Sequence, residues 1–411
     1  MVEAASPGAI PGTIEALTPD WLSACLVESG VLAHARVTDF ESDRIGAGEG
    51  LIGDVYRLRL RLDPLACDAP RTLIAKFPTA HERTRATAEL LGAYEREILF
   101  YRELAHEVPC RTPRCYGAAM EARPGSAEGD ARVRRIINAT PYWLLKLIAI
   151  LGRNALRSGQ KPYALLLEDL TPARAGDQLA GASTEELRAA TRTLAEVHAR
   201  FWNAPELFGR RWLLALDAAT RPLHLGYRAG RPRFEARYAA VVPESVSDLM
   251  ARLDAGGEML LRAFATRTPT LIHGDYRLDN LFFERTADGL AVGVIDWQAA
   301  ARGPGVYDLA YLVSSSVAAD DPRGQGLLDL YHETLEKRGA TGYGFERFQH
   351  DYREALLLML HRMVTAATSV EMPNTRSREL ADLWVTRLVS HLVETDFSDV
   401  LPRPTGALER S

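Results

Sequence analysis

The chain has 411 residues and a formal net charge of −5, with 47% hydrophobic and 25% charged residues. This composition is typical of globular proteins, and the length suffices for two large lobes. The negative charge argues against nucleic-acid binding, because that affinity depends on Lys and Arg neutralising phosphates. The N-terminal residues lack the features of a secretory signal, and no apolar run is long enough to span a membrane. We therefore expect a cytoplasmic protein without a transmembrane segment.

The hydrophobic pattern divides the chain into segments. Residues 1–12 and 398–411 are rich in Pro, Gly and polar residues, and we expect both to be flexible. Residues 13–170 mix strand-like and helix-like patterns and include an insert at about 121–160. Residues 171–397 consist mostly of long helical patterns. The pattern therefore predicts a small mixed lobe followed by a large helical lobe.

Strands and one helix are predicted in the first lobe. Residues 55–62 alternate between polar and apolar side chains, which predicts a strand. Residues 72–77 and 163–167 are further strand candidates, and apolar residues at helical spacing predict a helix over 82–106. This order of strands and a helix predicts that the first lobe contains both a sheet and a helix.

A glycine-rich motif, G-x-G-x-x-G, is formed by Gly48, Gly50 and Gly53. In a dinucleotide-binding fold this motif opens a helix, whereas in kinases it connects two antiparallel strands and covers the nucleotide phosphates. The strand predicted at 55–62 favours the second interpretation. Glycines suit such a loop because the backbone approaches the phosphates without a Cβ in the way. An ordinary glycine-rich turn is a third interpretation.

Lys76 lies within an apolar strand. Burial of an ammonium group is costly unless the group is paired. Lys76 therefore either faces water at a sheet edge, or is held by a carboxylate while it contacts nucleotide phosphates. Glu97 is the predicted partner, because it shares the inward face of the helix predicted at 82–106. Glu95 and Glu103 are alternatives that the spacing does not exclude.

A capping box at Ser183 and Glu186 predicts the start of a helix that contains His198 and Trp202. We expect these last two side chains to pack inside the helical lobe. Further helices are predicted from amphipathic patterns near 244–266, 304–316, 324–337, 345–370 and 376–395.

The strongest motif runs from His273 to Asn280, with Asp275 five residues before Asn280. This D-x-x-x-x-N spacing matches the kinase catalytic loop, in which Asp accepts the proton of the substrate hydroxyl and Asn binds magnesium. A β-hairpin is predicted next, because apolar runs flank an Asp-Gly turn, and Asp296 closes its second strand. Antiparallel pairing brings Asn280 and Asp296 to the same end, where two oxygen ligands suit Mg²⁺.

Arg277 follows Asp275 by two residues. In one interpretation this cation neutralises charge on the transferred phosphoryl group. In the other it forms a salt bridge with Asp279 or Asp308.

Together these residues resemble the aminoglycoside phosphotransferase and choline kinase superfamily, over roughly residues 18–395. The ecdysteroid-kinase-like branch is the most similar group, and the segments that suggest it are Leu165–Leu170, Ala175–Gln178, Leu194–Ala199, Asp296–Gln298 and Gly303–Tyr311. The resemblance implies an α+β, protein-kinase-like bilobal fold. Its small N-lobe would contain an antiparallel sheet, and its larger C-lobe would be mostly helical.

The resemblance also implies the cofactors ATP and Mg²⁺ and the roles of several residues. Asp275 would be the base, and Asn280 and Asp296 would hold the metal. Lys76 would pair with Glu97 at the nucleotide.

The segment from Glu168 to Leu170 would be the hinge, which offers backbone groups to adenine, and Asp308 would be a structural anchor. Protein kinases have a long activation segment after the metal-binding Asp, but here Asp308 follows Asp296 by only twelve residues. This short distance speaks against a protein substrate.

The insert at 121–160 is longer than the resemblance predicts. Residues Tyr142 to Leu151 are nearly all apolar, and the chain on either side is rich in arginine. The insert at 121–160 either shapes access to the acceptor, or its segment 142–151 lies peripherally against a membrane surface or an anionic partner. In the remaining interpretation, 142–151 packs as a helix onto the small lobe.

The predicted function is ATP- and Mg²⁺-dependent transfer of the γ-phosphoryl group to a hydroxyl of a small molecule, either antibiotic-like, sterol-like or another hydroxylated metabolite. A catalytically silent nucleotide-binding pseudokinase and an oxidoreductase are the alternatives. The sequence does not identify the acceptor.

Overall fold

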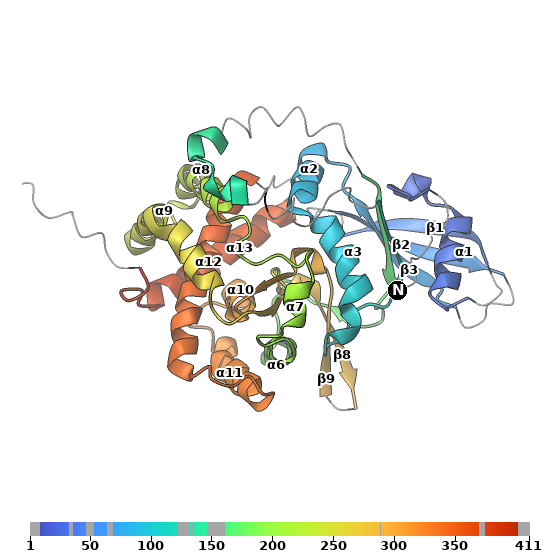
Figure 1. The fold of residues 1–411 in the computed structure, drawn as a ribbon. Helices are drawn as coiled ribbons and strands as arrows, with labels where there is room; N and C mark the ends of the chain where they lie inside the picture. The colour runs from blue at the N-terminus through green and yellow to red at the C-terminus, as the bar shows by residue number, and fades with distance from the viewer. Residues whose placement is uncertain are drawn as a thin grey trace, which may run out of the picture. The chain divides into compact units, whose positions relative to one another are not determined.

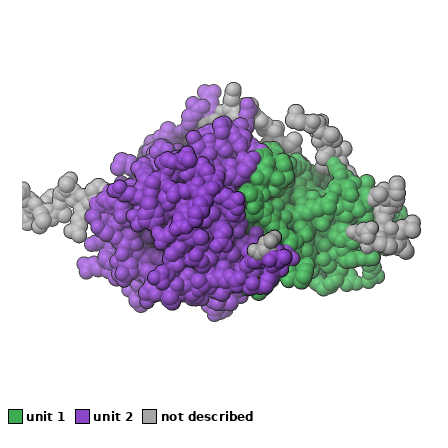
Figure 2. Space-filling model, turned by 90° about the horizontal axis from the view of Figure 1, so that it is seen from below, with its two compact units in different colours: residues 1–125, 149–174, 293–299 green, residues 126–148, 175–292, 300–411 purple. Residues whose placement is uncertain are grey.

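The computed structural model describes residues 9–32, 36–46, 53–63, 69–121, 132, 135–145, 161–287, 289–369 and 375–401. The chain divides into two units, which Figure 2 shows in different colours. Unit 1 comprises residues 1–125, 149–174 and 293–299, and unit 2 comprises residues 126–148, 175–292 and 300–411. The sequence-based boundaries placed 126–148 in the small lobe, and 171–174 and 293–299 in the large one, so the observed division differs at these three segments.

Unit 1 is built on a five-stranded antiparallel sheet with the order β1-β2-β3-β5-β4. Its strands are β1 (Val37–Ile45), β2 (Gly53–Leu62), β3 (Thr72–Pro78), β4 (Cys115–Met120) and β5 (Tyr163–Glu168). Its helices are α1 (Pro19–Glu28), α2 (Glu82–Leu91) and α3 (Ala93–Glu103), and its 3₁₀ turns are η1 (Ile14–Ala16), η2 (Ala105–Glu107) and η5 (Trp297–Ala299). Figure 1 shows the sheet between α1 and α3. The strands predicted at 55–62, 72–77 and 163–167 are confirmed.

The two faces of the sheet follow from the alternation of side chains along β3. Leu73, Ala75 and Phe77 are buried in a core that also contains Trp21 of α1. Lys76 therefore points to the opposite face, which α3 covers. The same alternation that buries the apolar residues directs the one ammonium group of the strand towards α3.

The helix predicted over 82–106 is interrupted. α2 ends at Leu91 and α3 begins at Ala93, because Gly92 adopts a left-handed conformation with φ +67°. A left-handed residue terminates a helix, and glycine adopts this conformation without the steric cost of a Cβ. The prediction of helical structure was right, and the prediction of one continuous helix was wrong.

Unit 2 is mostly helical. The helices whose bounds are described include α6 (Thr184–Arg200), α7 (Glu206–Gly209), α8 (Thr220–Tyr238), α9 (Glu244–Ala265), α10 (Val306–Ser316), α11 (Leu327–Lys337), α12 (Phe345–Ser369) and α13 (Thr375–Glu394). Short strands β7 (Thr270–Ile272) and β10 (Ala301–Gly303) pair with each other, and β6 (Arg174–Ala175), β8 (Leu281–Thr286) and β9 (Gly289–Val294) form a sheet in the order β6-β8-β9. The remaining 3₁₀ turns are η4 (Leu278–Asn280) and η6 (Pro322–Gly324). The predicted hairpin and the predicted helices are therefore confirmed.

The sequence pattern does not predict α8. This helix contains Gly226, Gly230 and Pro232, which weaken a helical pattern. It forms nonetheless because buried side chains such as Tyr227 and Phe234 pack it into unit 2, where α12 is its main neighbour. Tertiary packing here outweighs local propensity.

Part of the predicted insert is described and belongs to unit 2. The side-chain amide of Asn138 donates to the carbonyl oxygen of Ala218 at 3.2 Å, and the hydroxyl of Tyr142 donates to Glu258 at 2.7 Å. This part therefore packs against α8 and α9 of unit 2. The apolar residues 146–151 lie outside the described residues. Among the described residues, no helix is both long and apolar enough to cross a membrane.

Candidate active site

One cation and two carboxylates meet in unit 1. The ammonium nitrogen of Lys76 donates to Oε1 of Glu97 at 2.6 Å and to Oδ1 of Asp296 at 2.7 Å. The side chains of Lys76 and Glu97 are only 16% and 6% exposed. The predicted pairing of Lys76 with Glu97, in preference to Glu95 or Glu103, is confirmed. Asp296 is a second partner that the sequence did not connect to Lys76.

Burial and charge oppose each other at this site. Burial alone lowers the pKa of Lys76, but the charges of Asp296 and Glu97 outweigh it, and the pKa of Lys76 is raised. Burial raises the pKa of Glu97, and the nearby ammonium opposes that effect. Lys76 is therefore a fixed positive charge at neutral pH.

Asp296 is held in an unusual backbone conformation, with φ +66°. The next residue, Trp297, is 1% exposed and stacks on Phe100 with 4.1 Å between ring centroids. Gln298 donates to Oδ2 of Asp296 at 3.1 Å. The stacking on α3 explains why residues 293–299 belong to unit 1. Positive φ in a non-glycine residue costs energy and is concentrated at functional sites.

The glycine-rich motif lies in the connection between two antiparallel strands, since β1 ends at Ile45 and β2 begins at Gly53. Gly48 and Gly50 lie outside the described residues. A strand after the motif contradicts the dinucleotide-binding interpretation, in which a helix follows. Gly53 lines a small pocket together with Lys76, Glu97 and Gln298, so the start of β2 adjoins the Lys76 site.

The predicted hinge follows β5. Glu168 accepts a hydrogen bond from the backbone N–H of Arg114 at 3.1 Å, and Asp169 is bound by Arg57 at 2.8 Å. Leu170 is buried. These contacts hold the chain where it leaves the sheet, while the binding of adenine to this segment stays a prediction.

The loop that contains Asp275 is anchored by the carboxylate of Asp308. Asp308 accepts hydrogen bonds from the backbone N–H groups of His273 at 2.6 Å and Gly274 at 2.9 Å. Gly274 has φ +78°, a conformation that costs glycine little. His198 is fully buried and lies 3.4 Å from the same carboxylate. The predicted anchoring role of Asp308 and the predicted packing role of His198 both agree with these contacts.

Asn280, which the motif predicts as a metal ligand, is hydrogen-bonded to Asp275. Its side-chain nitrogen donates to the backbone oxygen of Asp275 at 2.8 Å and to Oδ2 of Asp275 at 3.1 Å. Gln178 supports the loop, because its side-chain oxygen accepts the backbone N–H of Leu278 at 2.9 Å. The carboxylate of Asp275 is thereby oriented by neighbours that are themselves held in place.

Two arginines approach Asp275. Arg277 binds Asp279 at 2.7 Å, which is one of the two predicted interpretations, and its Nε lies 3.6 Å from Asp275. Arg362 of α12 donates to Oδ1 of Asp275 at 3.4 Å, and the hydroxyl of Tyr311 is hydrogen-bonded to Asp275 as well. Sequence reasoning missed Arg362 and Tyr311. Arg362 lies 87 residues after Asp275, outside every quoted motif, and Tyr311 ends the segment Gly303–Tyr311, which was used only for the family resemblance.

The surroundings of Asp275 favour its ionised form. Burial raises the pKa of this carboxyl group, but Arg277, Arg362 and the hydroxyl of Tyr311 outweigh that effect, and the pKa is lowered. The group is thus a carboxylate at neutral pH. A carboxylate can accept a hydrogen bond from a hydroxyl group and orient it.

Asn280 and Asp296, the predicted Mg²⁺ ligands, have the right donor atoms. The nitrogen of the Asn280 amide is used by Asp275, and no side chain or backbone group of the described residues donates to its oxygen. Asp296 offers a carboxylate. An amide oxygen and a carboxylate oxygen are donors that Mg²⁺ accepts, with water and phosphate completing the shell. Asn280 belongs to unit 2 and Asp296 to unit 1.

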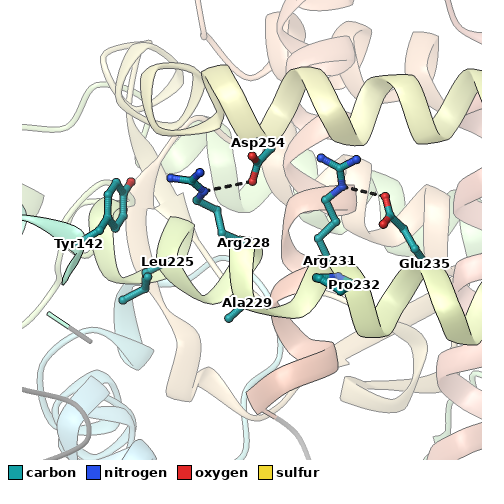
Figure 3. Close-up of a pocket in the computed structure, with 8 residues that line it drawn as sticks. All are labelled: Tyr142, Leu225, Arg228, Ala229, Arg231, Pro232, Glu235 and Asp254. Atoms are coloured by element: carbon teal, nitrogen blue, oxygen red, sulfur yellow. Dashed lines mark hydrogen bonds and ion pairs between the residues drawn. The ribbon is translucent and has the colours of Figure 1, made fainter. Parts of the chain in front are cut away.

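A cavity of about 490 Å³ in unit 2 is lined by α8, α9 and Tyr142 (Figure 3). Arg228 binds Asp254 at 3.2 Å and Arg231 binds Glu235 at 2.7 Å, so both arginines in its wall are paired with carboxylates. Its described lining includes no residue of the loop around Asp275. The insert therefore reaches this cavity through Tyr142, apart from the candidate catalytic residues.

Several solved structures are similar to this chain. Amicoumacin kinase in complex with AMP-PNP is 10% identical, with 91% of this chain and 96% of that chain covered and a TM-score of 0.49. A macrolide 2'-phosphotransferase from Brachybacterium faecium is 15% identical, with coverages of 89% and 98% and a TM-score of 0.44. An ethanolamine kinase from Plasmodium vivax is 9% identical, with coverages of 85% and 81% and a TM-score of 0.46. Comparison with curated proteins gave no match.

Residues 68–343, about two thirds of the chain, match the model of the phosphotransferase enzyme family. The fold is protein-kinase-like, with a small antiparallel sheet in unit 1 and a mostly helical unit 2. The predicted fold class is therefore confirmed. On the extent of this match, the chain belongs to the phosphotransferase enzyme family.

Proposed function

We propose that this chain transfers the γ-phosphoryl group of ATP, in the presence of Mg²⁺, to a hydroxyl group of a small molecule. The observation that carries the proposal is the position of Lys76, 2.6 Å from Glu97 and 2.7 Å from Asp296. In kinases, a strand lysine held by a helix glutamate contacts the nucleotide phosphates. Membership of the phosphotransferase family supports the same chemistry.

Unit 1 provides the nucleotide site in this proposal. Lys76 contacts the phosphates, and Glu97 fixes the direction of the ammonium group. The glycine-rich motif that ends at Gly53 covers the phosphates, and the segment from Glu168 to Leu170 offers backbone groups to adenine. Each of these groups binds or orients the nucleotide, which is the main catalytic task in phosphoryl transfer.

Unit 2 provides the acceptor groups. Asp275 orients the acceptor hydroxyl and accepts its proton as the new bond to phosphorus forms. Asn280, together with Asp296 of unit 1, would hold Mg²⁺, which when bound neutralises charge on the phosphates. In this proposal Arg277, which binds Asp279 at 2.7 Å, also offsets negative charge on the transferred phosphoryl group.

A small molecule is the proposed acceptor because the chain lacks room for a protein-kinase activation segment between Asp296 and Asp308. The segments that resemble the ecdysteroid-kinase-like branch support a hydroxylated metabolite, either sterol-like or antibiotic-like, as the substrate. Assignment to that branch is part of this proposal.

Phosphorus NMR of the protein with MgATP and a set of hydroxylated compounds tests the proposal. We expect a new phosphate monoester with the wild type and none with Lys76→Met. Lys337→Met is the matched control, because Lys337 is exposed on α11 and pairs only with Glu333 among the described residues. Binding of MgATP without transfer to any compound would instead indicate the catalytically silent module.

A further inference from the structure

Arg362 has an unusual position for an arginine beside a candidate catalytic carboxylate. It projects from α12, and its guanidinium lies over the ring of Tyr311 at 5.0 Å from the centroid. It donates to Asp275 and to the hydroxyl of Tyr307, both at 3.4 Å. Stacking on an aromatic ring fixes the plane of a guanidinium without using its N–H donors.

These two hydrogen bonds are long. Typical N–H···O bonds measure 2.7–3.2 Å, and charge-assisted ones are shorter still. By comparison, Arg277 binds Asp279 at 2.7 Å. The side chain of Arg362 is 37% exposed. A guanidinium has five N–H donors, so Arg362 retains donors for a ligand after its two long contacts are counted.

The described surroundings of Asp275 do not suit a cationic acceptor. The other carboxylate of the loop, Asp279, is bound by Arg277 and accepts the backbone N–H of Gln178 at 2.8 Å. Asp275 itself is engaged by the acceptor hydroxyl during the proposed reaction. A positively charged group next to that hydroxyl would therefore face the guanidinium of Arg362, while Asp279 is already bonded.

We infer that Arg362 binds an anionic group of the acceptor, a carboxylate or a phosphate, that lies next to the hydroxyl oriented by Asp275. The acceptor class is then a hydroxylated acid and not a polyamine. Guanidinium groups bind such oxyanions in a bidentate manner, with two parallel N–H···O bonds. This inference rests on the proposed function, because it names the substrate class of the same site.

Two sets of matched ligands test it: glycerate, glyceramide and aminopropanediol, and cholate, cholamide and the corresponding amine. Each set keeps one hydroxylated skeleton and changes only the charge. The melting temperature of the protein, saturated with MgADP, reports binding of each ligand. We expect the acid of at least one set to bind the wild type about tenfold more tightly than its amide or amine, and Arg362→Ala to lose that preference.

Two further variants separate binding from folding. Arg362→Lys keeps the charge but loses the bidentate geometry, so it is expected to retain part of the preference. Arg353→Ala is the matched control, because Arg353 lies on the same helix and forms an ion pair with Asp399 at 2.5 Å. It should keep the full preference for the acid.

The outcomes decide between the inference and the proposed function. If MgADP does not raise the melting temperature of the wild type, the proposed function fails. If MgADP stabilises the protein but the acids bind no better than the amines, or if the preference survives in Arg362→Ala, only this inference is overturned. A loss of MgATP affinity in Arg362→Ala with the acid preference intact would place the guanidinium on the nucleotide phosphates, and would overturn it too.

Discussion

The Lys76 site of unit 1 and the Asp275 site of unit 2 have opposite charge arrangements. In unit 1, one ammonium group lies between two carboxylates, with contacts of 2.6 and 2.7 Å. In unit 2, one carboxylate lies between two guanidinium groups, with contacts of 3.4 and 3.6 Å. The contacts at the Lys76 site are therefore about 1 Å shorter than the arginine contacts at the Asp275 site.

This difference indicates what each site does. Short contacts mean that the charged Lys76 is already oriented by its two ion pairs before any nucleotide binds, as suits a fixed contact to phosphate. The long contacts of Arg362 mean that its guanidinium still has N–H donors for a ligand. At the Lys76 site two carboxylates face one ammonium group, and this arrangement suits a divalent cation at Asp296. The guanidinium groups at the Asp275 site suit an anionic acceptor.

The largest expected effect is that of Asp275→Asn on phosphoryl transfer. Asparagine keeps the size of the side chain but cannot accept the proton of the acceptor hydroxyl. We expect the rate of transfer to fall by about 10²–10⁴-fold, the usual contribution of a general base. Phosphorus NMR with the acceptor found for the wild type measures the loss.

The same variant should bind MgATP normally, because the nucleotide contacts assigned to Lys76 belong to unit 1. Isothermal titration with MgATP measures this. Equal losses of transfer and nucleotide binding in Asp275→Asn would contradict the assignment of nucleotide binding to the Lys76 site and of acceptor activation to the Asp275 site.

The next effect concerns the charge at the metal ligands. Asp296→Asn removes the charge, and asparagine tolerates the positive φ of this position better than most residues. We expect MgATP affinity to fall by about 2 kcal/mol, roughly thirtyfold. Asn280→Ala removes only a dipole, and a loss of about 1 kcal/mol, roughly fivefold, is expected.

Titrating MgATP and metal-free ATP into both variants distinguishes metal binding from contacts with the nucleotide itself. The difference should appear with MgATP and shrink without the metal. If Asn280→Ala loses as much MgATP affinity as Asp296→Asn, the carboxylate is not the dominant ligand.

The regular elements around both sites could be predicted from the sequence. Alternation along 72–77 places Lys76 on the face opposite the apolar residues, and helical spacing puts Glu97 on the matching face of its helix. The Asp275–Asn280 spacing predicts that both residues belong to one loop, and the structure places their side chains within hydrogen-bond distance. These features could be predicted because they depend on periodicity and on residues that are close in the sequence.

Features that depend on long-range packing could not be predicted. The approach of Arg362 to Asp275 joins residues 87 positions apart, and only the packing of α12 brings them together. The pairing of Lys76 with Asp296 likewise depends on how Trp297 stacks on Phe100. The sequence did not predict α8, because Pro and Gly weaken its helical pattern.

Acid should weaken unit 2 through His361 of α12. His361 stacks on Tyr227 with 4.6 Å between centroids and lies 3.2 Å from a ring nitrogen of His224. Burial, together with the nearby His224, lowers the pKa of His361 to about 3. The unfolded chain therefore binds a proton between about pH 6.5 and 3 that the folded protein excludes. Stability is fully present above pH 6.5 and falls as the pH falls below it.

For one such histidine the expected loss is about 2 kcal/mol between pH 7 and pH 5. Urea unfolding at the two pH values measures it, and hydrogen exchange shows whether α8 and α12 open before the sheet of unit 1. His361→Asn should reduce the pH dependence. His106→Asn, at a side chain that is 71% exposed in unit 1, should leave the dependence unchanged. An equal pH dependence in His361→Asn and the wild type would rule out this histidine as the cause.

The smallest effect is expected from Ser183→Ala, which removes one half of the capping box of α6. The hydroxyl of Ser183 accepts the backbone N–H of Glu186 at 3.2 Å, and the carboxylate of Glu186 accepts the backbone N–H of Ser183 at 2.8 Å. Loss of such a cap costs about 1 kcal/mol of unfolding free energy. His198, which contacts Asp308, lies fifteen residues further along the helix, about 22 Å from the cap. Fraying of the first turn should therefore leave MgATP affinity and the preference for acidic ligands unchanged. If Ser183→Ala also abolished that preference, loss of stability alone would explain the effect of Arg362→Ala, and the charge difference between the two sites would no longer be the reason.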